Sequence, residues 1–160
     1  MRKLVLVMSI FLVSFCSNAQ DKKMALSVAV NAGVPVSSPS VYSFAVGGDL
    51  QADFAATEGL KITASAGYEN FSVKKDFGGG STGIIPLLAG AKFNLGSEKL
   101  YGHAQLGVGF GTQGGGGTLF AYAPSIGYYF SPNFDASLKY LAFSNHGTFG
   151  EVGVRLAYNF

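Results

Sequence analysis

Apolar and polar residues alternate one by one along most of the chain, and this alternation constrains the fold more than any other feature of the sequence. From Glu151 to Phe160, for example, every even position is Val, Leu, Tyr or Phe, and every odd position is Glu, Gly, Arg, Ala or Asn. A period of two is the period of a β-strand, whose successive side chains point to opposite faces. Eight such runs predict strands at Met24–Val34, Val41–Phe54, Leu60–Tyr68, Ile85–Asn94, Leu100–Gly111, Phe120–Phe130, Phe134–Tyr140 and Val152–Phe160.

The connections between these predicted strands alternate between short and long. Residues 55–59, 95–99 and 131–133 are expected to form compact turns, whereas residues 35–40, 71–83, 112–118 and the segment around 144–149 are expected to form more open loops. Short turns at one end and longer loops at the other are typical of outer-membrane barrels, in which both termini lie at the short-turn end. The sequence therefore predicts an all-β fold, an eight-stranded antiparallel up-and-down transmembrane β-barrel.

Charged residues decide which face of the predicted strands points outward. A soluble lipid-carrying barrel also has eight alternating strands, but its apolar face points inward. Here the charges lie opposite the apolar face among Gly, Ala, Ser, Asn and Gln, which suit a narrow, packed interior. We therefore expect an apolar wall facing outer-membrane lipid and a luminal polar network. That network comprises Asp49, Asp53, Lys61, Glu69, Lys92, His103, Gln105, Asp135, Lys139, Glu151 and Arg155.

Aromatic residues of the apolar face gather near the two expected ends of the barrel. Two aromatic girdles, one at each membrane interface, are a property of outer-membrane barrels. The short-turn end has Phe54, Phe93, Tyr128, Phe130, Phe134, Tyr158 and Phe160, and the loop end has Tyr42, Phe44, Tyr68, Phe110, Phe120, Tyr122 and Tyr140. Pro86 and Pro124 lie inside predicted strands, where each removes a ladder donor, and we expect a local bulge at each.

The first nineteen residues have the organisation of a secretory signal peptide. A basic start at positions 2–3 precedes an apolar run at 4–15, and small residues occupy the cleavage positions up to Ala19. The apolar run is shorter than the ~20 residues that a membrane-spanning helix needs. Phe15 disfavours the other alternative, a lipoprotein signal in which Cys16 is acylated. We therefore expect a signal peptide at 1–19, an outer-membrane β-barrel domain at 20–160, and export to the outer membrane.

Composition excludes several classes of function. Cleavage after Ala19 would leave nine basic and nine acidic residues and no cysteine. A net charge of zero argues against nucleic-acid binding, and a chain without cysteine has no disulfide scaffold. The two histidines lie on different segments, so no metal constellation is evident and no cofactor is expected. The segments Gly78–Gly80 and Gly114–Gly117 lack the ending and the following helix of a phosphate loop, so we expect flexible loop tips.

Four short segments carry a resemblance to a known family. They are the signal ending Ala19-Gln20, the strand start Ile85-Pro86-Leu87-Leu88-Ala89-Gly90, the strand Gly107-Val108-Gly109 and the terminal Tyr158-Asn159-Phe160. Together they resemble the small eight-stranded outer-membrane β-barrel family of Gram-negative bacteria, including porin-like members. The resemblance implies insertion by the barrel-assembly machinery, whose signal in such families includes a C-terminal aromatic, here Tyr158 and Phe160. We expect a monomer without enzymatic activity.

The last predicted loop carries a second resemblance. Residues 140–146 resemble the strand end of outer-membrane lipid A deacylases, which have a His-x-Ser-Asn sequence there. Ser144 and Asn145 match this sequence, but Ala142 stands at the histidine position, so the base that would activate the serine is missing. His146 lies beside Ser144 in the same loop, which makes a lipid-modifying esterase a minor alternative.

Two main classes of function fit the predicted architecture. Eight strands enclose an interior just wide enough for side chains, which favours a structural or surface-interaction protein with a packed polar lumen. Glycines on the interior face leave a second class open, a narrow channel or lateral portal for small or hydrophobic solutes. His103 beside Gln105 is expected to be a buried polar pair rather than a catalytic base.

The charges also predict how the last two strands pair. One alignment places Lys139 opposite Glu151 and Asp135 opposite Arg155, which makes two opposite-charge pairs with the connection centred on Asn145. An alignment that places Lys139 opposite Arg155 brings like charges together in a low dielectric. We therefore expect the first alignment.

Overall fold

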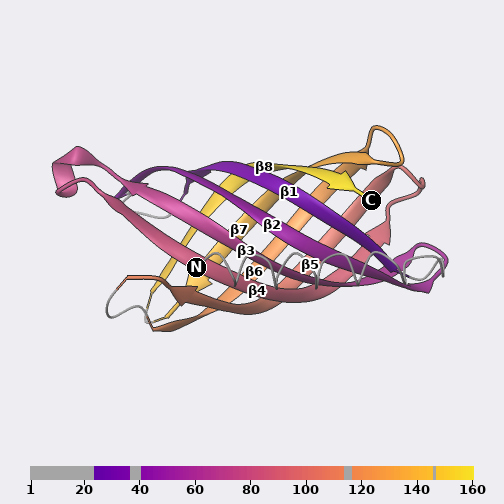
Figure 1. Ribbon diagram of the computed structural model, residues 1–160, viewed down its shortest axis with the longest axis horizontal. Coiled ribbons are helices and arrows are strands. Elements are labelled where there is room, and N and C mark those ends of the chain that lie inside the picture. Colours follow the sequence, from indigo (N-terminus) through magenta and orange to yellow (C-terminus); the bar gives the residue numbers. More distant parts are fainter. Residues whose placement is uncertain (1–23, 37–40, 114–116, 146) are drawn as a thin grey trace, which may run out of the picture.

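The computed structural model describes residues 24–36, 41–113, 117–145 and 147–160, which form a closed β-barrel (Figure 1). Its strands are β1 (Met24–Pro35), β2 (Tyr42–Thr57), β3 (Leu60–Val73), β4 (Ser81–Asn94), β5 (Leu100–Gly111), β6 (Thr118–Tyr129), β7 (Phe134–Ser144) and β8 (Thr148–Asn159). A 3₁₀ helix, η1 (Lys75–Phe77), lies between β3 and β4. Among the described residues, no helix is long and apolar enough to span a membrane. The predicted signal peptide lies outside these residues.

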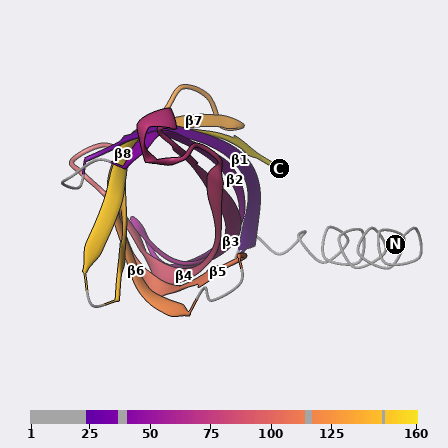
Figure 2. The ribbon, with the colours of Figure 1, turned by 90° about the vertical axis from the view of Figure 1, so that its left-hand side faces the viewer.

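Each strand pairs antiparallel with the next strand in the chain, and β1 closes the ring by pairing with β8. The view along the barrel shows this ring of strands (Figure 2). Short connections join neighbouring antiparallel strands directly, which produces the up-and-down order. Because the barrel is closed, every strand pairs with a neighbour on both sides. A sheet exposed to lipid requires this, since lipid offers no hydrogen-bond partners for backbone N–H and C=O groups. The predicted all-β, eight-stranded antiparallel barrel is confirmed.

The hairpin of β3 and β4 is longer than the sequence predicted. Strand β3 continues to Val73 and β4 begins at Ser81, so much of the loop expected at 71–83 is paired strand. This hairpin extends beyond the other strands at the left of Figure 1, which we call the outer end, and the opposite end is the inner end. Here the interior face of β3 carries the apolar Phe71 and its outward face carries polar Asn and Ser, so the apolar-outward pattern that predicts the strands ends although the backbone pairing continues.

The pairing of β7 with β8 also differs from the prediction. The structure pairs Ser137 with Arg155, Lys139 with Gly153 and Leu141 with Glu151. The predicted alignment of Lys139 with Glu151 and of Asp135 with Arg155 is therefore wrong by two residues. Strand β7 continues to Ser144 and β8 begins at Thr148, so the strands extend into the segment around 144–149 that was expected to form an open loop. A long charged side chain in a narrow barrel reaches partners across the lumen, so charge matching between neighbouring strands does not determine their register.

The two prolines interrupt the hydrogen-bond ladder without producing bulges. Pairing of β3 with β4 lapses at Pro86 and pairing of β6 with β7 lapses at Pro124, but the register is the same on both sides of each gap. The predicted bulges at these prolines are therefore wrong. Each proline stays paired with β5 and loses its pairing toward the opposite neighbour, as expected for a residue without an N–H donor. Register shifts occur instead in β2, between Tyr42 and Phe44 and between Ala55 and Thr57.

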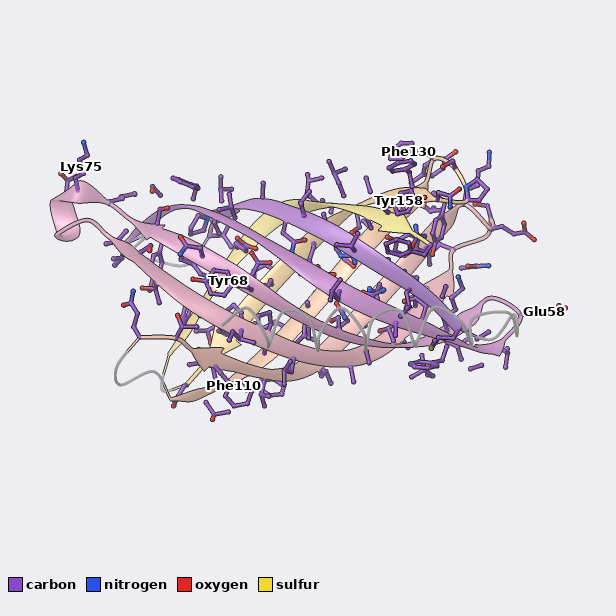
Figure 3. The ribbon with its side chains drawn as sticks, viewed as in Figure 1. Glu58, Tyr68, Lys75, Phe110, Phe130 and Tyr158 are labelled. Carbon is purple, nitrogen blue, oxygen red and sulfur yellow. The ribbon has the colours of Figure 1, made fainter. Side chains whose placement is uncertain are left out.

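The outside of the barrel is apolar along its length. Large apolar side chains on it are exposed, among them Val30 at 63%, Leu106 at 60% and Leu138 at 55%. Phe130 and Tyr158 lie toward the inner end, on the side of the Glu58 turn, and Tyr68 and Phe110 lie toward the outer end (Figure 3). These positions agree with the two predicted girdles.

Candidate functional site in the barrel interior

The barrel interior has two zones that differ in chemistry. The inner zone consists of the predicted luminal network with its hydrogen-bond partners. The structure buries Asp53, Glu69, Lys92, His103, Gln105, Asp135, Lys139, Glu151 and Arg155, and places Asp49 and Lys61 half-buried on the same face. The outer zone consists of Tyr42, Ala45, Phe71, Ile84, Leu88, Leu119, Ala121, Ala123, Leu141, Phe143 and Phe149.

Arg155 joins two carboxylates in the inner zone. Its Nη2 lies 2.7 Å from Asp49 Oδ1 and its Nε lies 3.0 Å from Asp49 Oδ2. Its Nη1 lies 3.9 Å from Asp135 Oδ1. Asp135 also accepts hydrogen bonds from the hydroxyl of Tyr101 at 2.6 Å and from Nδ2 of Asn159 at 2.8 Å. Charge-assisted hydrogen bonds of this kind are the strong ones, and here they link four strands across the lumen.

A second ion pair joins β2 and β4. Lys92 Nζ lies 2.9 Å from Asp53 Oδ2, and Gln51 donates to the other oxygen of Asp53 at 2.6 Å. The Lys92 ammonium also lies 4.8 Å from the centre of the Tyr101 ring and 5.8 Å from that of Tyr129. A buried charge is costly unless it is paired, and both members of this pair have partners.

His103 and Gln105 bind hydroxyl groups of β3. His103 Nε2 lies 2.8 Å from Thr63 Oγ1, and Gln105 Nε2 donates to Ser65 Oγ at 2.9 Å. Both side chains are buried inside the barrel. A general base must reach a proton of its substrate, and here the barrel encloses the His103 ring, whose Nε2 is bonded to Thr63.

The outer zone is an aromatic cluster that the sequence analysis did not predict. The rings of Phe71, Phe143 and Phe149 pack at centroid distances of 5.6–6.1 Å, and Tyr42 lies 5.4 Å from Phe71. Phe71, Leu141 and Phe143 have no exposed surface. The cluster therefore fills the lumen at the outer end.

Two features explain why this cluster was missed. Phe71 and Phe143 lie beyond the ends of the predicted strands, and Tyr42 was assigned to the outer girdle. The register shift between Tyr42 and Phe44 turns Tyr42 to the interior. One extra residue in a strand moves the side chains that precede it to the opposite face of the sheet. The sequence does carry one signal, since Leu88 is a large apolar residue on the otherwise polar face of its strand.

Glycines on the interior face make room for large side chains. A Cβ at Gly127 would overlap the ring of Tyr101, and a Cβ at Gly109 would lie 2.7 Å from ring carbons of Phe143. These glycines therefore admit neighbouring aromatic rings.

Ser144 lies at the end of β7 and is bonded within its own hairpin. Its hydroxyl accepts a hydrogen bond from Thr148 Oγ1 at 3.1 Å, and Ala142 at the position of the deacylase histidine is buried. His146 lies outside the described residues. Within the described part of the chain, no group of three or more His, Cys, Asp or Glu is placed to hold a metal ion.

No protein-family model and no curated protein sequence matches the chain. Solved structures do match. The attachment invasion locus protein Ail of Yersinia pestis, in complex with the heparin analogue sucrose octasulfate, superimposes with a TM-score of 0.62 at 16% identity, over 86% of this chain and 98% of that one. The N-terminal β-barrel domain of Pseudomonas aeruginosa OprF matches with a TM-score of 0.61 at 14% identity, over 85% and 97%.

The outer membrane enzyme PagL matches with a TM-score of 0.59 at 13% identity, over 82% of this chain and 98% of that one. These proteins share an architecture with the chain and differ in what they do. The fold is that of the small eight-stranded outer-membrane β-barrels, as the sequence resemblance indicated.

Proposed function

We propose that this protein is an outer-membrane barrel of the structural or surface-interaction type rather than a channel or an enzyme. The observation that carries the proposal is the filled interior, with ion pairs in the inner zone and packed aromatic rings in the outer zone. Side chains that fill both zones would leave no continuous path for a solute, and this supports the proposal. The outer hairpins are then the parts of the molecule available for contact with surroundings.

Single-channel recording tests this proposal. Protein refolded into a planar lipid bilayer should give no conductance steps, and circular dichroism of the same preparation should establish that it is folded. Regular steps from folded protein would contradict the proposal and favour the narrow channel instead.

The apolar wall supports an outer-membrane location. Monomeric soluble proteins rarely expose apolar patches larger than a few hundred Å², whereas here large apolar side chains are exposed on all eight strands. Cell fractionation should recover the protein with the outer membrane, and N-terminal sequencing should begin at Gln20. Recovery in soluble periplasm, or retention of Met1, would contradict this part of the proposal.

The hairpin of β3 and β4 is the proposed contact surface. It extends farthest at the outer end and carries Lys75 at its tip (Figure 3). In intact cells, trypsin should cut after Lys74 or Lys75, and Lys99 in the β4–β5 turn should be cut only after the outer membrane is made permeable. Cleavage at Lys99 first would reverse the proposed orientation.

Assembly should depend on the last aromatic residues. Phe160 is 70% exposed at the inner end, its ring lies 5.1 Å from that of Tyr158, and its backbone N–H donates to Leu26 at 2.9 Å. We propose barrel-assembly machinery as the partner that reads this end. Phe160→Ser should reduce the folded yield in cells far more than shortening of residues 114–117, and equal yields of the two variants would contradict this.

A further inference from the structure

The outward face of the β3–β4 hairpin changes its chemistry at the outer girdle. Up to Tyr68 the outward residues of β3 are apolar or aromatic, and the next two on that face are Asn and Ser. Their partners on β4 are Gly and Ser, and the hydroxyl of Thr112 on β5 donates to the Gly83 carbonyl at 3.1 Å. We call this surface the polar face, and it consists of Asn70, Ser72, Ser81, Gly83 and Thr112.

The polar face begins at the level of the lipid headgroups. Aromatic girdles mark the membrane–water interfaces of transmembrane barrels, and Tyr68 and Phe110 lie toward the outer end (Figure 3). Asn70 and Ser72 follow Tyr68 by two and four residues, which places them about 5 and 10 Å farther along the membrane normal if the strands tilt by about 40°. The headgroup layer of a bilayer is about 5–8 Å thick on each side. Asn70 therefore lies within this layer, and a larger headgroup is needed to reach Ser72.

Three polar groups lie close together at the start of the polar face. A Cβ at Gly83 would overlap the hydroxyls of both Tyr68 and Thr112, so the glycine allows the two hydroxyls to lie over β4. Asn70 Nδ2 lies 3.5 Å from the Tyr68 hydroxyl, and Tyr68 is 46% exposed. Hydroxyl and amide groups both donate and accept hydrogen bonds. This cluster therefore suits a ligand that is rich in hydroxyl groups.

The composition of the polar face does not suit phosphate. Phosphate oxygens are acceptors, and Arg and Lys bind them most strongly. None of the five described residues that form the polar face is charged. Lys74 and Lys75 belong to the hairpin tip, where Figure 3 shows Lys75. Sugar hydroxyls, which donate as well as accept, match this face better than a phosphate group does.

We propose that the polar face binds the sugar headgroup of a glycolipid in the outer leaflet. This inference deepens the proposed surface-interaction function and rests on it, because the hairpin must lie at the outer surface of the membrane. The hydroxyls of Tyr68 and Thr112 and the amide of Asn70 bind sugar hydroxyls, and the apolar body of the Tyr68 ring packs against the sugar. The acyl chains of the same lipid lie along the apolar wall.

Competition between two lipids tests the proposal. The full chain is refolded in detergent micelles that contain equal amounts of digalactosyldiacylglycerol, a neutral glycolipid, and phosphatidylglycerol with the same acyl chains. Native mass spectrometry then measures how much of each lipid remains bound. We expect about fivefold more bound glycolipid, the factor that one net hydrogen bond provides. Equal retention of the two lipids would overturn the proposal.

Variants of nearly unchanged shape locate the contact. Tyr68→Phe/Thr112→Val removes two hydroxyls of the cluster and should abolish the preference for the glycolipid. Tyr140→Phe/Thr148→Val removes the same groups from the β7–β8 hairpin and should keep that preference. Circular dichroism checks that each variant is folded, and Tyr68→Phe alone serves if the first double variant is not. An equal loss in both hairpins would mean that the preference does not depend on the polar face, and this too would contradict the proposal.

Phosphate binding at the hairpin tip is the competing outcome. It would give more bound phosphatidylglycerol than glycolipid, Lys75→Gln would remove that excess, and the proposal would be wrong. Lipid retention is measured separately from conductance. A folded barrel without conductance steps and without a lipid preference would overturn this inference and leave the proposed function standing, whereas conductance steps together with a glycolipid preference would contradict the proposed function alone.

Discussion

The inner and outer zones of the lumen are both packed, but different forces hold them. In the inner zone the members of each ion pair depend on a partner at a fixed place, as Arg155 does on Asp49 at 2.7 Å. In the outer zone Phe71, Phe143 and Phe149 are held by apolar burial and dispersion, which have no preferred direction. The inner zone should therefore respond sharply to single changes, and the outer zone should respond gradually.

Replacement of Arg155 should lower the free energy of unfolding the most. Arg155→Leu leaves Asp49 and Asp135 buried without their counter-charge, and loss of one partner from a buried pair costs about 3–5 kcal/mol. The double variant Asp49→Leu/Arg155→Leu should be more stable than Arg155→Leu alone, because it removes one of the unpaired carboxylates. Urea unfolding of the refolded proteins measures both, and identical midpoints for the two variants would contradict the dominance of ion pairing in this zone.

A glycine from each zone provides a matched comparison. Gly127→Ala pushes a methyl group into Tyr101, whose hydroxyl is fixed on Asp135, and should cost about 2–3 kcal/mol. Gly109→Ala pushes the same group against Phe143, whose ring has no hydrogen bond to hold it in place, and should cost about 1 kcal/mol. The free energies of unfolding of the two variants measure the difference. A greater loss in Gly109→Ala would mean that the aromatic cluster is the more rigid zone.

Lys61 should matter least among the luminal charges. It is half-buried, and its ammonium lies 5.7 Å from the centre of the Tyr129 ring. Such a contact contributes about 0.5–1 kcal/mol at exposed sites, so Lys61→Ala should lower the free energy of unfolding by no more than about 1 kcal/mol. A loss as large as that of Arg155→Leu would mean that the inner zone depends on its total charge rather than on particular pairs.

The sequence was informative about the inner zone because charge marks its interior face. Residues such as Asp53 and Lys92 follow the period-two pattern, and the structure buries them. The same pattern says little about which residues pair. Arg155 binds Asp49 on β2, whereas a comparison of neighbouring strands assigned it to Asp135 on β7.

The outer zone was unpredictable from alternation for a physical reason. Around Phe143 both faces of β7 are apolar, so no period of two remains to be read. Around Phe71 the interior face of β3 is apolar and the outward face has Asn70 and Ser72, which reverses the pattern of the other strands. Whether Tyr42 faces the interior or the lipid depends on a single extra residue in β2, and the composition of the strand does not reveal that residue.

The gaps in the ladder at Pro86 and Pro124 have a mechanical consequence. Strands β4, β5 and β6 pair with one another without a gap. The pairing of β4 with β3 has one gap, at Pro86, and the pairing of β6 with β7 has one gap, at Pro124. The bilayer exerts lateral pressure on the whole wall of the barrel. We expect the barrel to deform first where hydrogen bonds between neighbouring strands are missing. Backbone amides next to Pro86 and Pro124 on the sides facing β3 and β7 should therefore exchange with deuterium sooner than the amides of β5.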